Sequence, residues 1–302
     1  MMSIRIGTSI THHEIFDRRG LRQIKEGGKW MREQGARATW QRRALPDLVL
    51  VGVQRSGTTA LTEALYRLSN VERPRLGKGS HYFSYNYHRG WPWFQSQFPT
   101  SIAAAAVERF KGRPLFCFDA CPYYLFHPFA VERMAQALPE VKVLVMLRDP
   151  VRRAESHYHH SVTHGHEELD FEEAVAAESK RLAGEDERMQ QDWTYWSHGH
   201  EHHSYISKGM YADQLERLFR FYPTDQVKVL QSEAFYRNAD TVLAEVTDWL
   251  NLPAVTLDPA DDRNANQYKP MDEKIRASLT EIYREPNERL FALLGTRYDW
   301  IS

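Results

Sequence analysis

A short apolar segment that runs directly into a glycine-containing turn is the feature that most constrains how this chain can fold. Residues 48–53 read Leu-Val-Leu-Val-Gly-Val, and residues 54–59 read Gln-Arg-Ser-Gly-Thr-Thr. A continuous, valine-rich apolar run of this length is typical of a strand buried on both faces of a parallel sheet. Leu61, Leu65 and Leu68 then recur at helical spacing, so the sequence predicts a strand, a tight loop and a helix in succession.

Three further apolar segments are predicted to be strands, and they alternate with helical patterns. We expect the strands at 114–118, 141–147 and 227–230, and helices at 127–138, 151–164, 171–183, 208–221 and 239–250. This alternation favours parallel βαβ units. We therefore predict a three-layer α/β fold with a central parallel β-sheet flanked by helices. Residues 46–302 are expected to form its single domain, and the polar residues 1–45 a leader or a docked arm.

Charge and composition argue against several classes of protein. The 302 residues include 39 Lys and Arg against 40 Asp and Glu, a net charge of -1. A nucleic-acid binder usually has a basic excess, so we expect no nucleic-acid partner. No apolar stretch approaches the ~20 residues of a membrane span. Cys117 and Cys121 cannot make a disulfide framework, and no secretory signal is evident, so a reduced, cytoplasmic protein is expected.

The loop at residues 52–59 has the strand–turn–helix context of a phosphate-binding loop. Its backbone N–H groups can form an anion-binding nest, and the helix dipole adds partial positive charge. Gly52 and Gly57 have the spacing of a Walker A loop, but Thr58 stands where an NTPase needs Lys. Arg55 can supply the charge instead. The alternative is a simple glycine turn between a strand and a helix.

A second anion site is predicted where the strand 141–147 ends. Arg148 follows this strand, Pro150 suits the start of a helix, and Ser156 lies on that helix. Ligands of open α/β sheets bind at the carboxyl ends of the strands, where an Arg guanidinium and a hydroxyl together can hold a phosphate. The alternative is an Arg148 paired with Asp149, with the serine as a cap.

Together these motifs resemble those of the sulfotransferases that use 3′-phosphoadenosine 5′-phosphosulfate (PAPS), in the bacterial and heparan-sulfate branch of the family. The segments that carry the resemblance are 51–59, 77–83, 91–94, 148–150 with Arg152 and Ser156, 208–215 and 268–271. The resemblance implies a P-loop-like fold that binds PAPS across the strand ends. It assigns the 5′-phosphosulfate to Arg55, Ser56, Gly57, Thr58 and Thr59, and the 3′-phosphate to Arg148 and Ser156.

Two positions depart from the pattern of the heparan-sulfate branch. Gly79 occupies the place of a catalytic Glu, and Ala120 that of a catalytic Lys. The transfer of a sulfuryl group needs no obligatory metal, but one group must accept a proton.

His81 is the candidate base, because its unperturbed pKa of ~6.5 lets it accept a proton at neutral pH. Asp119 could orient His81 or act as the base itself. Arg55 and Lys78 are candidates to stabilise charge on the sulfuryl group. The alternative for His81 is a structural histidine.

Aromatic residues are concentrated in two segments beside the proposed base. Tyr82, Phe83, Trp91 and Trp93 lie in the first, and Tyr123 and Tyr124 in the second. Aromatic faces suit a sugar ring, a phenol or a lipid, so we predict that part of these side chains form an acceptor wall. The alternative is core packing. The near-neutral charge favours a small-molecule, carbohydrate or lipid-linked acceptor over a long polyanion.

Two histidine-rich segments have residue types that bind metal. His157, His160 and His164 share one face of a predicted helix, and residues 198–203 read His-Gly-His-Glu-His-His. We expect the first set to line the cleft or the surface, and the second to belong to a loop or lid over the acceptor. No metal site is therefore predicted.

Two other functions fit parts of the pattern. A nucleotide kinase or NTPase of related fold would explain the glycine loop, but Thr58 replaces the Walker Lys and Arg148 replaces a strand-end acid. A catalytically inactive protein that binds PAPS, or its product 3′-phosphoadenosine 5′-phosphate (PAP), would explain Gly79 and Ala120.

Overall fold

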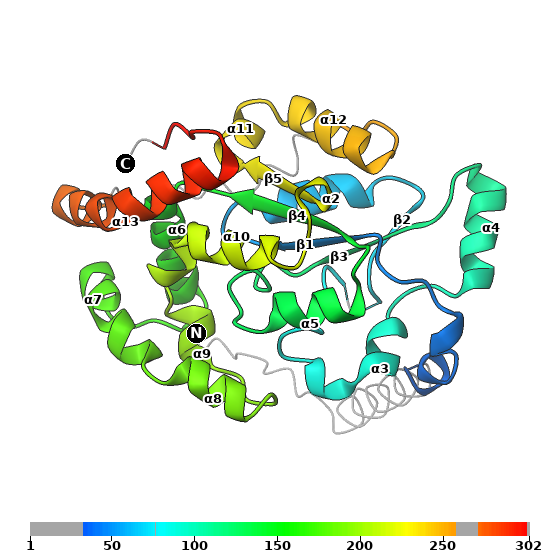
Figure 1. Ribbon diagram of the computed structural model, residues 1–302, viewed down its shortest axis with the longest axis horizontal. Helices are drawn as coiled ribbons and strands as arrows, with labels where there is room; N and C mark the ends of the chain where they lie inside the picture. Colours follow the sequence, from blue (N-terminus) through cyan, green and yellow to red (C-terminus); the bar gives the residue numbers. More distant parts are fainter. Residues whose placement is uncertain (1–32, 76, 258–270, 301–302) are drawn as a thin grey trace, which may run out of the picture.

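A parallel sheet forms the centre of the computed structural model, which describes residues 33–75, 77–257 and 271–300 (Figure 1). Within these residues the strands are β1 (Leu48–Gly52), β2 (Val71–Glu72), β3 (Phe116–Ala120), β4 (Lys142–Leu147) and β5 (Val227–Gln231). They lie in the order β2-β3-β1-β4-β5, and every pairing is parallel. Because β1 is central and the chain continues to either side of it, a crevice is expected at its carboxyl end.

Helices surround this sheet. They are α2 (Thr58–Tyr66), α3 (Trp91–Gln95), α4 (Ser101–Lys111), α5 (Ala130–Ala137), α6 (Pro150–Thr163), α7 (Phe171–Leu182), α8 (Glu185–Gln191), α9 (His198–His202), α10 (Tyr211–Phe219), α11 (Ser232–Arg237), α12 (Ala239–Leu250) and α13 (Glu273–Leu294). Short 3₁₀ turns occur at Trp40–Arg42, Tyr87–Arg89, Ser207–Gly209 and Thr224–Gln226. No helix in the described ranges combines the length and the apolar character needed to cross a bilayer.

Two hydrophobic clusters cover the two faces of the sheet. Alternate residues of β1 point to opposite sides, so Val49 and Val51 join one cluster while Leu48 and Leu50 join the other. The first cluster includes buried side chains of α3, α5 and α10, and the second those of α2 and α12. Figure 1 shows α2 and α12 on one side of the sheet and α5 on the other. The predicted three-layer α/β fold with a central parallel sheet is confirmed.

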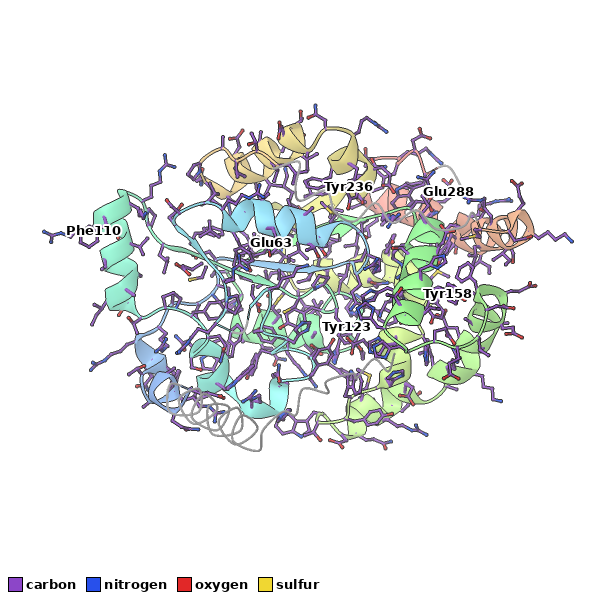
Figure 2. All side chains as sticks on the ribbon, turned by 180° about the vertical axis from the view of Figure 1, so that it is seen from behind. Glu63, Phe110, Tyr123, Tyr158, Tyr236 and Glu288 are labelled. Carbon is purple, nitrogen blue, oxygen red and sulfur yellow. The ribbon has the colours of Figure 1, made fainter. Side chains whose placement is uncertain are left out.

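Several boundaries differ from the predicted ones for identifiable reasons. The strand expected at 114–118 is β3, Phe116–Ala120, because Asp119 pairs with Val49 in the buried ladder despite its charge. The helix expected at 208–221 is divided into a 3₁₀ turn and α10. The helix α4 was not predicted, since it buries none of its residues and therefore has no core-facing stripe. Phe110 of α4 points away from the body of the molecule (Figure 2).

The described part of the predicted N-terminal arm contacts the α3 region. Glu33 forms an ion pair with Arg89 at 2.7 Å and accepts a hydrogen bond from Trp93 Nε1 at 3.0 Å. Arg43 Nη1 donates to the Phe98 carbonyl at 2.7 Å, and the Ala44 amide donates to the Pro99 carbonyl at 2.9 Å. Residues 33–45 are thus docked, whereas residues 1–32 of the arm lie outside the described residues.

Candidate functional site

The loop between β1 and α2 has the backbone form of an anion nest. Gly57, at the start of α2, has φ +84°, and a Cβ there would lie 2.8 Å from Tyr236 Oη. Arg55 has φ +73°, a left-handed conformation that is uncommon for a residue with a side chain. Such strained residues cluster at ligand sites. The glycine at 57 is therefore required both for its conformation and for its close contact.

The two predicted anion motifs meet at this loop. Arg55 Nε donates a hydrogen bond to Ser156 Oγ on α6 at 3.2 Å, and Arg148 Nη1 donates to the Arg55 carbonyl at 2.9 Å. Arg55 Nη1 also lies 3.4 Å from His160 Nδ1. Burial, followed by the charge of Arg55, lowers the pKa of His160 to about 4, so this imidazole is neutral. The Arg148 side chain, the Arg55 backbone and Ser156 are thus linked to one another at the ends of β1 and β4.

The remaining loop side chains are close to a lysine from another segment. Lys78 Nζ lies 3.0 Å from Thr59 Oγ1 and 3.5 Å from Thr58 Oγ1. Burial lowers the pKa of Lys78 to about 8. Ser56 is fully buried, and its Oγ has no hydrogen-bond partner among the described residues. A buried hydroxyl without a partner is rare, and a ligand oxygen in the loop would satisfy it.

A cavity of about 340 Å³ opens beside Arg148. Its walls are basic and aromatic side chains together with acids and a serine: Arg148, Asp149, Arg152, Ser232, Glu233, Tyr236, Arg237, Asp299 and Trp300. Asp149 caps α6 by accepting a hydrogen bond from the Val151 amide at 2.9 Å, and in the described structure it forms no ion pair with Arg148. The guanidinium of Arg148 is therefore not neutralised by its neighbour in sequence.

His81 lies at the edge of the site, with its ring stacked on Tyr85 at 4.9 Å between centroids. Its φ of +50° is left-handed, and its amide donates to Cys121 Sγ at 3.1 Å. The Nδ1 atom is buried and has no partner among the described residues. Burial lowers the pKa of His81, the charge of Glu201 opposes this, and the charge of Lys78 adds to it. The ring is therefore neutral at pH 7 and can accept a proton.

Among the described residues, Asp119 forms no hydrogen bond with the His81 ring and instead binds Ser80, the residue before His81. Its Oδ1 accepts from the Ser80 amide at 2.7 Å and its Oδ2 from Ser80 Oγ at 2.6 Å. The side chain is completely buried, and burial raises its pKa to about 6. Both oxygens accept hydrogen bonds and the side chain has no exposed surface, which favours a structural role for Asp119; that it acts as the base stays a prediction. It fixes the backbone that carries His81.

The two departures from the heparan-sulfate pattern lie against each other. A Cβ on Gly79 would be 2.2 Å from the Ala120 carbonyl oxygen and 2.6 Å from Cys121 Sγ. No glutamate fits there without moving β3. Burial raises the pKa of the Cys121 thiol far above its ordinary value, so this sulfur is neutral.

Sequence reasoning missed Glu201 on α9. Its Oε1 accepts a hydrogen bond from Tyr85 Oη and its Oε2 one from Trp196 Nε1, both at 2.5 Å. Tyr85 also stacks on His81, so the Glu201 carboxylate is linked to the candidate base through this one tyrosine. The expected lid over the acceptor, residues 198–203, therefore does approach His81. The position of Glu201 within a histidine-rich run gave no signal of this contact.

Most of the side chains predicted for the acceptor wall lie in the core, which was the alternative interpretation. Tyr82, Phe83, Trp93 and Tyr124 are at most 4% exposed and belong to the cluster on one face of the sheet. Tyr123 is buried as well, with its Oη 2.7 Å from His200 Nδ1. Trp91 packs against the same cluster while partly exposed. Tyr82, Phe83, Trp93 and Tyr124 thus help to cover the sheet, whereas Tyr123 lies outside that cluster.

Exposed aromatic side chains occur instead on the segment before α9. Trp193 is 54% exposed and Trp196 is 47% exposed. Together with Tyr85 and Tyr123 they line a small pocket next to the His81 stack.

The helix face proposed for His157, His160 and His164 is divided among different environments. His157 is buried against Tyr205 at 5.0 Å between centroids, His160 lies beside Arg55, and His164 is exposed. In segment 268–271, the last of those that resemble the sulfotransferases, Tyr268, Lys269 and Pro270 lie outside the described residues.

Comparison with known proteins gives one consistent family. The family model described as "Sulfotransferase domain" matches residues 45–280. A sulfotransferase of known structure from Alicyclobacillus acidocaldarius superposes with a TM-score of 0.61 at 27% sequence identity, over 84% of this chain and 98% of that one.

Three proteins of known name also match. The membrane-associated sulfotransferase kil1 of Dictyostelium discoideum is 22% identical, over 85% of this chain and 66% of that protein. The bifunctional heparan sulfate N-deacetylase/N-sulfotransferase 3 of Homo sapiens is 27% identical, over 83% of this chain and 30% of that protein. The heparan sulfate glucosamine 3-O-sulfotransferase 3B1 of Mus musculus is 24% identical, over 85% of this chain and 65% of that protein. The chain thus spans about a third to two thirds of the length of these relatives.

Proposed function

The chain belongs to the sulfotransferase domain family, and on that premise we propose that it transfers a sulfuryl group from PAPS to a hydroxyl or an amine of its acceptor. The observation that carries this proposal is the convergence of Arg55, Ser156 and Arg148 at the ends of β1 and β4. An anion with two phosphate groups is the ligand that these two arginines and the serine suit.

Each part of PAPS has a proposed place. The 5′-phosphosulfate lies in the loop of residues 55–59, where the Ser56 hydroxyl gains the partner that it lacks. The 3′-phosphate binds to Arg148 and Ser156. The adjoining cavity of about 340 Å³, with Tyr236 and Trp300 in its wall, takes the adenosine. These groups hold an anion without a metal ion.

The proposed reaction is an in-line displacement at sulfur. The acceptor oxygen or nitrogen forms a bond to sulfur, and the bond from sulfur to the phosphate oxygen breaks, so PAP leaves with that electron pair. The proton of the acceptor passes to the neutral ring of His81. Arg55 and the cationic form of Lys78 stabilise the charge on the sulfuryl oxygens. The negative charge of Glu201 favours the imidazolium that forms.

A carbohydrate is the favoured acceptor class. Two of the relatives are named for heparan sulfate, and sugar rings bind against exposed aromatic faces such as Trp193 and Trp196. The net charge of -1 gives no sign of a broad basic track for a long polyanion. A short or weakly charged sugar, free or lipid-linked, therefore fits best.

The test is transfer of labelled sulfate from PAPS to a panel of sugars, phenols and lipids. His81→Ala should lower turnover by roughly 10²–10⁴-fold, the usual contribution of a general base. The affinity for PAP should stay the same, since His81 is placed on the acceptor side. The matched control is His88→Ala, because His88 is an exposed histidine of the same segment. If His81→Ala has wild-type turnover, His81 is not the base. If the wild-type protein transfers sulfate to no acceptor of the panel, the alternative of an inactive PAP-binding protein is favoured.

A further inference from the structure

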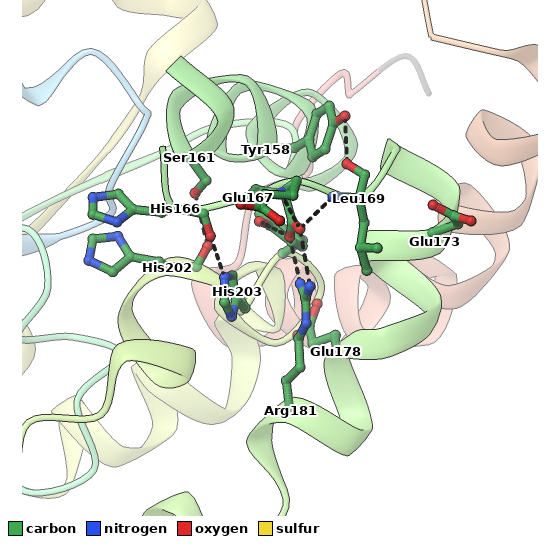
Figure 3. A network of polar contacts seen from close by, with 12 residues as sticks. Tyr158, Ser161, His166, Glu167, Leu169, Glu173, Glu178, Arg181, His202 and His203 are labelled. Carbon is green, nitrogen blue, oxygen red and sulfur yellow. Dashed lines mark hydrogen bonds and ion pairs between the residues drawn. The ribbon is translucent and has the colours of Figure 1, made fainter. Parts of the chain in front are cut away.

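Three histidines from two separate segments converge on one point outside the proposed PAPS site. His166 follows α6, while His198 and His202 lie one helical turn apart on α9 and so share a face. One ring nitrogen of each residue lies within 4.8 Å of the others. The rings of His166 and His202 stack at 3.8 Å between centroids, and Figure 3 shows them side by side.

The spacing of the nitrogen atoms matches that of metal ligands. His198 Nε2 and His166 Nδ1 are 3.3 Å apart. Two nitrogen ligands at ~2.0–2.1 Å from a tetrahedral ion would be about 3.3–3.4 Å apart. A hydrogen bond between these two rings would explain that one contact. It would not explain His202, which forms no hydrogen bond with either ring in the described structure.

The backbone around these histidines is held independently of any metal. Glu167, next to His166, accepts hydrogen bonds from both Nη atoms of Arg181 at 2.5 and 3.1 Å (Figure 3). It also accepts one from Tyr205 Oη at 2.8 Å. His203 Nε2 lies 2.7 Å from the His166 carbonyl oxygen. These contacts join the end of α6 to α7 and α9, so the three rings meet on a rigid frame.

We propose that His166, His198 and His202 form a binding site for one transition-metal dication of the zinc class. Imidazole ligands suit Zn²⁺, Co²⁺, Ni²⁺ and Cu²⁺, whereas Mg²⁺ and Ca²⁺ prefer oxygen. Three protein ligands leave a fourth position for water or an incoming group. Glu201 Oε2 lies 3.8 Å from His202 Nε2, so a carboxylate is close to the proposed ligands without being hydrogen-bonded to this ring.

The site has a structural consequence for the proposed reaction centre. Glu201 lies between the ligands on α9 and accepts a hydrogen bond from Tyr85, which stacks on His81. A bound ion ties α9 to the end of α6 and thereby fixes this carboxylate. Metal binding itself does not depend on His81 or on PAPS, so it can be measured separately from sulfate transfer.

The test uses the full chain without an affinity tag, stripped of metal with a chelator and then titrated with Zn²⁺ in a calorimeter. We expect one equivalent to bind, and affinity to fall by at least about tenfold in each of His166→Ala, His198→Ala and His202→Ala. Two control variants should bind Zn²⁺ like the wild type. They are His164→Ala, at the exposed carboxyl end of α6, and His88→Ala, elsewhere on the surface. His81→Ala should also bind normally.

Absorption of the Co²⁺-loaded wild type gives a second measurement that needs no variant to fold. Intense visible bands typical of four-coordinate Co²⁺ are expected, and they should disappear on adding excess Zn²⁺. Absence of stoichiometric binding, a weak octahedral spectrum, or an equal loss in the His164→Ala control would overturn the site. Circular dichroism of each variant without metal should match the wild type, because the Glu167 network is unchanged.

Discussion

Single residues in the site have ionisation states that depend on where they are buried. Burial lowers the pKa of Lys78 to about 8 and also lowers the pKa of His81. The proposed mechanism needs Lys78 as a cation and His81 as a neutral ring. The first condition holds below the pKa of Lys78, and the second holds above the pKa of His81. Activity is therefore confined between these two values.

The pH dependence of kcat/KM should be bell-shaped. The acidic limb is expected below pH 6.5, the ordinary pKa of histidine, because His81 must lose its proton first. The basic limb is expected near pH 8, where Lys78 loses its charge. Lys78→Arg keeps the charge at high pH and should move only the basic limb upward. A basic limb that stays in place in this variant would assign it to another group.

The sequence predicted some of these residues and could not predict others. Arg55, Arg148 and Ser156 are found from local motifs, because a strand, a loop and a helix N-terminus determine where they point. The partner of Asp119 is Ser80, 39 residues away, and the partner of Glu201 is Tyr85, 116 residues away. No local pattern encodes such contacts, since they depend on how distant loops pack.

At the scale of elements, the segment 77–81 is shaped by its contact with the end of β3. Asp119 holds Ser80 by two hydrogen bonds, and Gly79 lies against the Ala120 carbonyl. The segment therefore presents Lys78 to the loop and His81 to the Tyr85 stack. The absence of the heparan-sulfate-branch glutamate at position 79 thus goes with a different local packing, in which Gly79 lies against the Ala120 carbonyl.

Restoring that glutamate should not restore a base. Gly79→Glu places a Cβ 2.2 Å from a backbone oxygen, and overpacking of this kind costs at least about 1–3 kcal/mol in the free energy of unfolding. We expect a lower denaturant midpoint and lower sulfate transfer. The matched control is Gly35→Glu, because Gly35 has open space around it. A Gly79→Glu variant with wild-type stability and higher turnover would contradict this packing argument.

Element prediction followed the apolar pattern and failed where that pattern is weak. β1, β4 and α12 are continuous or strongly periodic, and their predicted ranges are close to the observed ones. β2 has only two residues, and α13 contains Pro286 inside 22 helical residues. A short edge strand carries little periodicity, and an internal proline normally indicates a break.

For the whole molecule, a nearly neutral chain holds a proposed polyanion through a few positioned groups. The net charge is -1, so attraction from the surface as a whole is weak. The strand order places β1 in the centre, and the carboxyl ends of β1 and β4 bring Arg55 and Arg148 together. Affinity for the nucleotide should therefore depend on individual contacts, and above all on the one made to the 3′-phosphate.

The central claim is that this site recognises a 3′-phosphorylated nucleotide, and calorimetric titration of PAP against adenosine 5′-phosphate, with a chelator present, tests it most directly. The wild type should prefer PAP by about tenfold or more, the value of one charge-assisted hydrogen bond. In Arg148→Ala this preference should largely disappear, because adenosine 5′-phosphate lacks the group that Arg148 binds. Equal affinity of the wild type for both nucleotides, or an unchanged preference in Arg148→Ala, would contradict the account.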